Sequence, residues 1–214
     1  MSNLVLIITD EERYPPIYEN EELKNFRDTQ LPRYKWLRDN GVEFKLHHIS
    51  SSACSPSRAS ILTSQYPEFH GLKNTYGVAK DVSEIDWIHP ESLPTMGHYF
   101  KELGYSTHYI GKWHISNLDL YDEDGNILQT VDDKGNRIIA NEKKYRDANL
   151  LAPYGFDNFW IGPERHGPMK NNCGEVVDPI LADYFIEWYE TVDKSVPFFV
   201  VISFINPHDI VLEP

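Results

Sequence analysis

The chain has 214 residues, of which 41% are hydrophobic and 25% are charged, so it can bury a core. Its net charge of −13 argues against sequence-independent nucleic-acid binding and against docking on anionic lipid. Two cysteines exclude a disulfide-rich module, and the apolar run at 4–8 is too short for a membrane span or a signal peptide. These features predict a soluble, cytoplasmic protein, with a periplasmic or secreted location as the alternative.

The first third of the chain alternates predicted strands and helices. Residues 4–8 are uninterrupted apolar residues, which is typical of a strand buried on both faces of a parallel sheet. The helical spacing of apolar residues predicts one helix over about 21–40, ended by an Asn-Gly pair. Residues 42–48 alternate apolar and polar and predict a second strand, and a helix is expected over 57–64.

The rest of the chain continues this alternation. A helix N-capped by a threonine is predicted over 95–103, followed by a strand over 105–110. Two Gly-Asn turn signals within 119–137 predict a surface hairpin insertion. An amphipathic helix over 180–192 and a last apolar strand over 198–204 complete the pattern.

This order of elements predicts an α/β protein with a mostly parallel central sheet flanked by helices. In such sheets, ligands bind beyond the carboxyl ends of the strands. Polar clusters directly follow three of the predicted strands: Asp10-Glu11, Lys112 with His114, and His208-Asp209. Polar residues follow strands wherever a chain turns at the surface, so the clusters gain meaning only together with other motifs.

The segment around Cys54 is the most informative part of the sequence. Cys54 is followed by Pro56, Arg58 and a predicted helix, so free backbone N–H groups and a fixed positive charge would lie beside it. This setting favours an anion and a reactive thiolate. A buried structural cysteine that happens to precede a helix is the alternative on spacing alone.

Cys54-Ser55-Pro56-Ser57-Arg58 resembles the Cys-x-Pro-x-Arg signature of the sulfatases, in the alkaline phosphatase superfamily. Five further segments resemble that family in the same order and extend the resemblance over essentially the whole chain: residues 3–10, 60–71, 111–114 (Gly-Lys-Trp-His), 154–157 and 206–208. The resemblance implies an alkaline-phosphatase-like α/β fold. It also implies that residues 1–214 are the N-terminal part of a sulfatase catalytic domain.

The resemblance further implies a divalent metal ion, calcium in the first place, with magnesium or manganese as alternatives. Asp10 would be one ligand, and Cys54, oxidised after translation to formylglycine, another. Glu11 occupies a position where sulfatases often have a second aspartate, and it is the third candidate ligand. Carboxylate oxygens at a strand end suit such a hard cation. Without the resemblance, Asp10-Glu11-Glu12 would be interpreted as an acidic turn.

Five residues receive catalytic roles from the resemblance. The hydrate of formylglycine at position 54 attacks sulfur, and His208 protonates the leaving alcohol oxygen. Arg58 and Lys112 stabilise charge on the transferred group, and His114 hydrogen-bonds the hydrate or takes its proton as the aldehyde re-forms. Taken alone, Lys-Trp-His would be a solvated loop. The other histidines and the second cysteine are interpreted as surface or structural residues, with His70 left open.

The implied activity is hydrolysis of the sulfuric ester of a small molecule or a glycan, as in the arylsulfatases. A phosphonate or phosphodiester hydrolase with the same nucleophile is the nearest alternative, because these esters share a tetrahedral shape. A non-catalytic binding module descended from a sulfatase is the third hypothesis. Because sulfatases are typically much longer and supply further metal ligands beyond His208, we expect an incomplete chain without turnover of its own. Its partner would be a C-terminal half or a second copy, and neither nucleic acid nor a membrane.

Overall fold

The computed structural model describes residues 1–76, 80–160, 162 and 174–211. The chain forms two compact units, one of residues 1–11 and 50–214 and the other of residues 12–49. The second cysteine, Cys173, and one of the other histidines, His166, lie outside the described residues. Among the described helices, none is long and apolar enough to cross a membrane.

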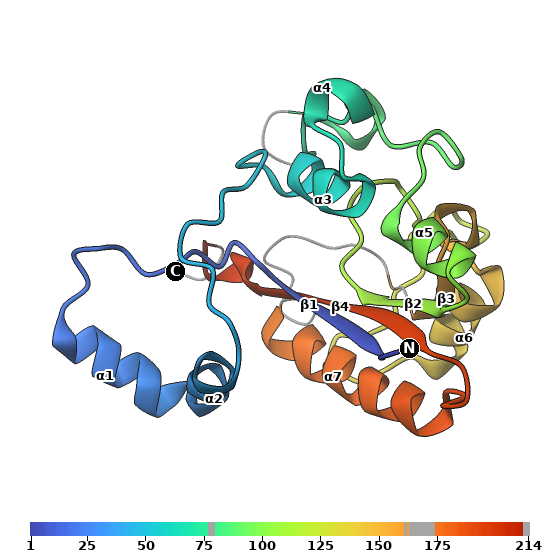
Figure 1. Ribbon diagram of the computed structural model, residues 1–214. Coiled ribbons are helices and arrows are strands. Elements are labelled where there is room, and N and C mark those ends of the chain that lie inside the picture. The colour runs from blue at the N-terminus through green and yellow to red at the C-terminus, as the bar shows by residue number, and fades with distance from the viewer. Residues whose placement is uncertain (77–79, 161, 163–173, 212–214) are drawn as a thin grey trace. The chain divides into compact units, whose positions relative to one another are not determined.

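A four-stranded parallel sheet forms the centre of the larger unit, with the strands in the order β1-β4-β2-β3 (Figure 1). The strands are β1 (Leu4–Asp10), β2 (Ser106–Gly111), β3 (Asp157–Trp160) and β4 (Phe198–Pro207). β4 lies between β1 and β2, so the last strand in the sequence pairs with both the first and the second. The predicted α/β class with a parallel sheet is therefore confirmed.

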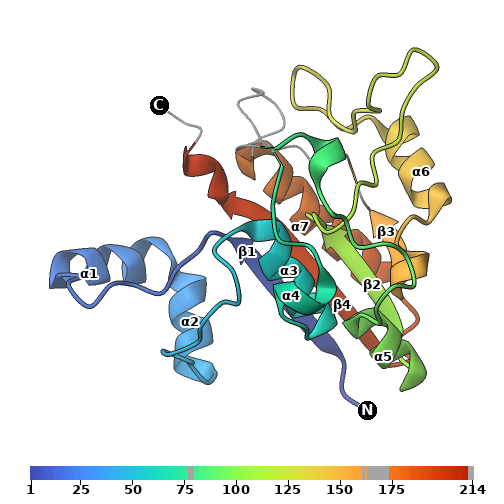
Figure 2. The ribbon, with the colours of Figure 1, turned by 90° about the horizontal axis from the view of Figure 1, so that it is seen from above.

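Helices cover both faces of this sheet, as Figures 1 and 2 show: α7 lies on one face, and α3 and α5 lie on the other. The α-helices of the unit are α3 (Cys54–Thr63), α4 (Pro67–His70), α5 (Met96–Glu102), α6 (Ile139–Ala148) and α7 (Gly174–Thr191). Short 3₁₀ turns are η1 (Val82–Glu84), η2 (Ala152–Tyr154) and η3 (His208–Val211). The two-sided cover explains why β4 has few polar side chains.

Successive side chains of β4 enter two different cores. Phe199 and Val201 pack in the core that also holds Trp113, whereas Val200 and Ile202 pack with Leu181 of α7. This alternation follows from the two-residue period of a strand. The apolar sequence of β4 therefore reflects burial on both faces.

β1 is a strand as predicted, but the prediction that it is buried on both faces is wrong for the described residues. Leu6 and Ile8 pack against the core, whereas Val5 and Ile7 have exposed fractions of 47% and 55%. β1 is at the edge of the sheet, and α7 covers β4 and β2. An apolar run predicts a strand well but does not reveal the strand's place in the sheet.

The smaller unit contains two helices where the sequence predicted one, α1 (Glu21–Gln30) and α2 (Pro32–Asn40). The break comes at Leu31 because the residue before a proline is disfavoured in helical conformation. The strand predicted over 42–48 is wrong, because these residues pair with no described strand and their apolar side chains are exposed. Alternation describes a strand's faces, but a strand also needs a pairing partner.

Local capping and turn chemistry account for other boundaries. Thr95 caps α5 as predicted, since its Oγ1 accepts a hydrogen bond from the Gly97 N–H at 3.1 Å. Residues 119–137 contain two successive short turns, bridged at Tyr121–Ile127 and at Val131–Arg137. Each turn begins with an aspartate whose carboxylate accepts hydrogen bonds from backbone N–H groups two and four residues later.

Candidate active site

Cys54 is the first residue of α3, one turn before Arg58 on the same helix. The helix begins here because Ala53 has an extended conformation and its carbonyl accepts the first intrahelical bond, from the Ser57 N–H at 3.1 Å. Pro56 lies in the first turn, where a missing N–H costs nothing. The thiol is therefore at the positive end of the helix, as the sequence predicted.

Among the residues that the structure describes, two polar side chains contact the Cys54 sulfur. His114 Nδ1 lies 3.2 Å from Sγ, and Thr75 Oγ1 lies 3.5 Å from it. Ser55 Oγ donates to the same Thr75 hydroxyl at 3.2 Å. An atom bonded to Cβ of residue 54 thus lies within reach of an imidazole nitrogen and a hydroxyl.

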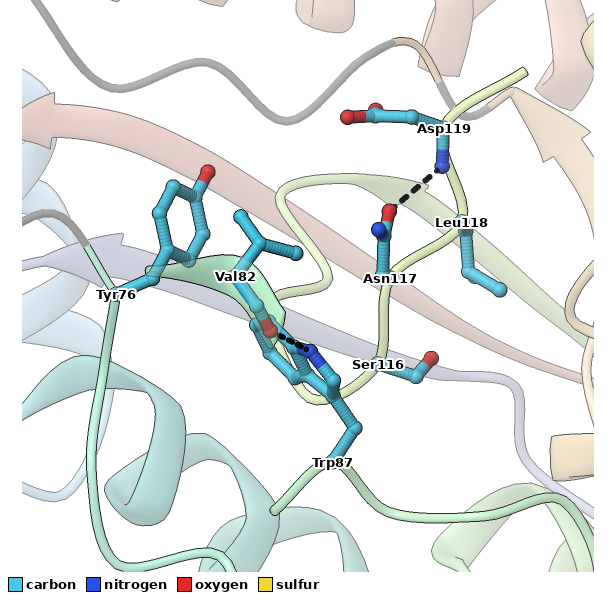
Figure 3. A pocket seen from close by; sticks show the side chains of 7 residues that line it. All are labelled: Tyr76, Val82, Trp87, Ser116, Asn117, Leu118 and Asp119. Carbon is cyan, nitrogen blue, oxygen red and sulfur yellow. Dashed lines mark hydrogen bonds between the residues drawn. The ribbon is translucent and has the colours of Figure 1, made fainter. Parts of the chain in front are cut away.

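His114 is held firmly in this position. Its side chain is buried, and its backbone has φ of +62°, in the left-handed region that non-glycine residues rarely adopt. The Tyr76 ring lies edge-on to the imidazole with centroids 5.2 Å apart, and Trp87 lies 6.3 Å away. A small hollow of about 20 Å³, close to the room for one water molecule, lies beside Tyr76 and Trp87 and extends to Asp119 (Figure 3). Its size rules out this hollow, as described, as the place for a whole substrate.

A buried charge cluster joins the ends of β1 and β2 to α3. The Asp10 carboxylate forms an ion pair with Lys112 Nζ, and its other oxygen lies 3.6 Å from Arg58 Nη2. All three side chains are at most 8% exposed. Burial would raise the pKa of Asp10, but the charges of Arg58 and Lys112 outweigh it and hold that pKa below its ordinary value of 3.8. The cluster carries an excess of positive charge.

Arg58 also fastens the sheet to α3. Its Nη1 donates to the Lys112 carbonyl at 2.8 Å and to Ser203 Oγ at 2.7 Å. Its Nε and Nη2 are buried and make no hydrogen bond with any described residue. A buried donor without an acceptor is costly, so these two groups are suited to the oxygen of an anion.

His208 lies directly after β4, beside the end of β1. Its Nε2 lies 4.0 Å from Glu11 Oε1, and its Nδ1 lies 2.9 Å from Asp209 Oδ1. The Glu11 side chain is half exposed, and its backbone is left-handed with φ of +61°. His208 also helps to lower the pKa of Asp10, so it lies within electrostatic range of the charge cluster.

The residues that the sequence selected are therefore brought together at the carboxyl ends of three parallel strands. The contacts form two groups, one of Cys54 with His114 and one of Asp10 with Arg58 and Lys112. His208 with Glu11 adjoins the second group.

Thr75 and Ser203 were missed. Ser203 could have been found as the one hydroxyl within the apolar run of β4, whereas no local pattern marks Thr75.

His70, left open by the sequence, has a structural role. Its Nε2 lies 3.1 Å from Ser60 Oγ, and its Nδ1 accepts a hydrogen bond from the Leu72 N–H. Burial lowers the pKa of His70. Both ring nitrogens are used within the fold, so His70 connects α3 to the loop after α4.

The Sulfatase family model matches residues 2–213 of this chain. The chain belongs to the sulfatase family. It is 27% identical over 206 residues to a Caenorhabditis elegans protein named as a putative extracellular sulfatase Sulf-1 homolog, and the match covers 96% of this chain and 26% of that protein. It is 29% identical over 117 residues to the steryl-sulfatase of Homo sapiens, over 53% of this chain and 19% of that protein. This sulfatase chain thus spans about a quarter of the first relative's length.

Solved structures resemble the same fold. A phosphonate monoester hydrolase of Agrobacterium radiobacter superposes with a TM-score of 0.56 and 19% identity, over 97% of this chain and 41% of that one. A 2-O glycosaminoglycan sulfatase superposes with a TM-score of 0.54 and 16% identity, over 98% of this chain and 36% of that one. These likenesses confirm the predicted sulfatase-type fold.

Proposed function

We propose that this protein hydrolyses sulfuric esters, with residue 54 as nucleophile after oxidation of Cys54 to formylglycine. The observation that carries the proposal is the position of Cys54 Sγ, at the N-terminus of α3 and 3.2 Å from His114 Nδ1, in a chain of the sulfatase family. The hydrated aldehyde supplies two hydroxyl groups on Cβ, one to attack sulfur and one whose proton is lost when sulfate leaves. The chain's other residues prepare and complete that chemistry.

Two histidines move the protons. His208 Nε2 donates a proton to the alcohol oxygen as its bond to sulfur breaks, which avoids release of an alkoxide. His114 Nδ1 is within hydrogen-bond reach of residue 54 and takes the proton of the second hydroxyl as the aldehyde re-forms. The burial of His114 by Tyr76 and Trp87 keeps its ring in place between these events.

Arg58 and Lys112 stabilise the transferred sulfate group. Two buried nitrogens of Arg58, Nε and Nη2, make no hydrogen bond among the described residues, and Lys112 is 2% exposed at the side chain. Because both charges are withdrawn from water, they act on a developing anion more strongly than surface charges would. The buried Asp10 carboxylate offsets part of the repulsion between the two cations.

Asp10 and residue 54 are also the proposed ligands of a divalent metal, with Glu11 as a further candidate. A buried carboxylate at a strand end has the right donor chemistry for calcium or magnesium. Residues 1–76, 80–160 and 174–211 contain no group of three histidine, cysteine, aspartate or glutamate side chains that could hold a metal. The described residues therefore supply part of a donor set, and further ligands would complete it. A bound cation would add positive charge at the sulfate oxygens.

We propose a sulfated glycan or small molecule as the substrate. A solved relative that superposes with a TM-score of 0.53 was crystallised with D-glucosamine-2-N,6-O-disulfate, which supports the glycan. The phosphonate monoester hydrolase among the similar structures supports phosphonate esters as the second candidate. Both candidate substrates carry a tetrahedral anionic group, so Arg58 and Lys112 of the charge cluster could stabilise either one.

The test begins with the full-length protein from its native source. Peptide mapping across residue 54 should find formylglycine, and intact mass should exceed that of 214 residues. The same protein should hydrolyse 4-nitrophenyl sulfate faster than a 4-nitrophenyl phosphonate monoester, and Cys54→Ala should abolish both activities. An unmodified thiol at residue 54 together with no hydrolysis would refute the proposal and favour a binding module. Faster hydrolysis of the phosphonate would establish the second candidate. The isolated 214-residue chain is expected to show no turnover.

A further inference from the structure

The imidazole of His208 has a carboxylate partner on the side that faces away from Glu11. Asp209 Oδ1 lies 2.9 Å from His208 Nδ1, and the Asp209 side chain is only 5% exposed. A carboxylate can only accept a hydrogen bond, so His208 Nδ1 is the donor in this pair. The hydrogen bond therefore directs Nε2 toward the end of β1, where it lies 4.0 Å from Glu11 Oε1.

The second oxygen of Asp209 is used as well. Asp209 Oδ2 accepts a hydrogen bond from the Gly174 N–H at 2.7 Å, at the start of α7. Each oxygen of this carboxylate therefore has one donor, a side chain on one side and the helix backbone on the other. Asp209 cannot turn away from His208 without breaking its bond to α7.

A second carboxylate fixes the backbone that carries His208. Asp178, on α7, accepts hydrogen bonds from the N–H groups of Ile205 and Asn206 at 2.7 and 2.9 Å. Gly174 packs so closely that an added Cβ would lie 2.6 Å from the Asn206 side chain. The end of β4 is thus held at two points, and of these two carboxylates Asp209 contacts the imidazole whereas Asp178 binds the backbone.

We propose that Asp209 is a positioning residue for His208: it holds the Nδ1–H tautomer, aims Nε2 at the leaving oxygen, and balances the charge of the protonated ring. This inference rests on the proposed sulfatase function and deepens it. Asparagine at this position keeps one acceptor oxygen in place of two and carries no charge. Asp209→Asn therefore cannot satisfy both donors.

The leaving group provides the test, because a proton donor matters most when the departing oxygen is a poor leaving group. We expect Asp209→Asn in the full-length protein to lower kcat/KM for phenyl sulfate about 10- to 100-fold, and for 4-nitrophenyl sulfate less than about threefold. Asp178→Asn is the matched control, since it alters the same junction without touching the imidazole. Asp178→Asn should change kcat/KM for both substrates by the same factor.

A double-mutant cycle separates the role through His208 from a general structural one. If Asp209 acts through the imidazole, Asp209→Asn should have no further effect on the ratio of the two substrates once His208→Gln is present. Equal losses for both substrates in Asp209→Asn, or a further change of the ratio in the double variant, would overturn the proposal.

A measurement without turnover keeps the inference separate from the proposed function. Long-range ¹H–¹⁵N correlation spectra of labelled histidines, assigned with His208→Gln, should show neutral His208 protonated at Nδ1, and Asp209→Asn should shift this equilibrium. A protein that hydrolyses no ester but shows this tautomer would refute the proposed function while supporting the placement of the proton. The Nε2–H tautomer in the unaltered protein would overturn the inference whatever the activity.

Discussion

Replacing His108 by phenylalanine is expected to make the fold less sensitive to acid. His108 lies in β2, with its ring centroid 4.9 Å from that of Trp188 in α7, and its Nε2 is buried without a hydrogen bond to any described residue. Burial lowers the pKa of His108 from 6.5 to about 4, and the nearby charges of Asp157 and Lys101 act on it in opposite directions. The folded state therefore resists protonation of this ring.

The sign and the size follow from linkage. The unfolded chain takes up the proton near pH 6.5 and the folded chain only near pH 4, so stability falls as the pH drops through this interval. Each pKa unit corresponds to about 1.4 kcal/mol, so the whole loss is about 3 kcal/mol, of which about 2 kcal/mol is reached at pH 5. Phenylalanine has a ring of similar size and no proton to take up, so His108→Phe should lose this component.

Urea denaturation of both proteins at pH 8 and pH 5 measures the difference. The free energy of unfolding should fall by about 2 kcal/mol less in His108→Phe than in the unaltered protein. His89→Asn, which alters an exposed histidine, controls for the removal of an imidazole. Equal acid losses in His108→Phe and the unaltered protein would refute the argument that burial of this ring opposes protonation.

Three further predictions concern the site. Gly111 has φ of +97°, and an added Cβ would lie 2.1 Å from the Ser203 carbonyl oxygen, so Gly111→Ala should lower the free energy of unfolding by about 3 kcal/mol. The control is Gly125→Ala, where φ is +82° and the space is open; urea denaturation should show a loss of about 1 kcal/mol. Arg58→Met leaves the buried carboxylate with one cation fewer, and should cost about 3 kcal/mol in the same assay and abolish ester hydrolysis. Thr75→Val removes a hydroxyl beside the nucleophile and the acceptor of the buried Ser55 hydroxyl, so it should lower kcat about 10-fold and also lower the melting temperature. Thr75→Ser keeps the hydroxyl and should retain most activity; an unchanged kcat in Thr75→Val would contradict this.

Two kinds of element could be predicted from the sequence: those marked by a local residue pattern, and strands that are buried on both faces of the sheet. β4 was correct because an apolar strand in a parallel sheet is buried on each side, and the N-terminus of α5 was correct because Thr95 provides its own cap. The strand at 42–48 failed because pairing is not a local property. α6 was missed: its buried residues are Glu142 and Tyr145, and the Tyr145 hydroxyl is held by the backbone of Leu120 and Leu128, outside the helix.

The site could be predicted only as a set of residues. Motif order selected Cys54, Lys112 and His208 without any knowledge of distances. The sequence did not reveal that Lys112 pairs with the proposed metal ligand Asp10, because that contact depends on the adjacent ends of two strands far apart in the chain. Thr75 escaped for the same reason, since only the folded loop after α4 brings its hydroxyl to the sulfur.

The left-handed backbone at Glu11 and His114 has a consequence for directed evolution. Any residue other than glycine costs about 1 kcal/mol in this conformation, so Glu11→Gly, at a half-exposed side chain, would relieve backbone strain, whereas His114→Gly would also remove a buried, packed ring and lose more stability than it gains. A library screened for heat resistance alone should therefore enrich glycine at position 11 and lose the side chain that faces His208. Thermostable variants of this protein therefore have to be screened for heat resistance and for ester hydrolysis together.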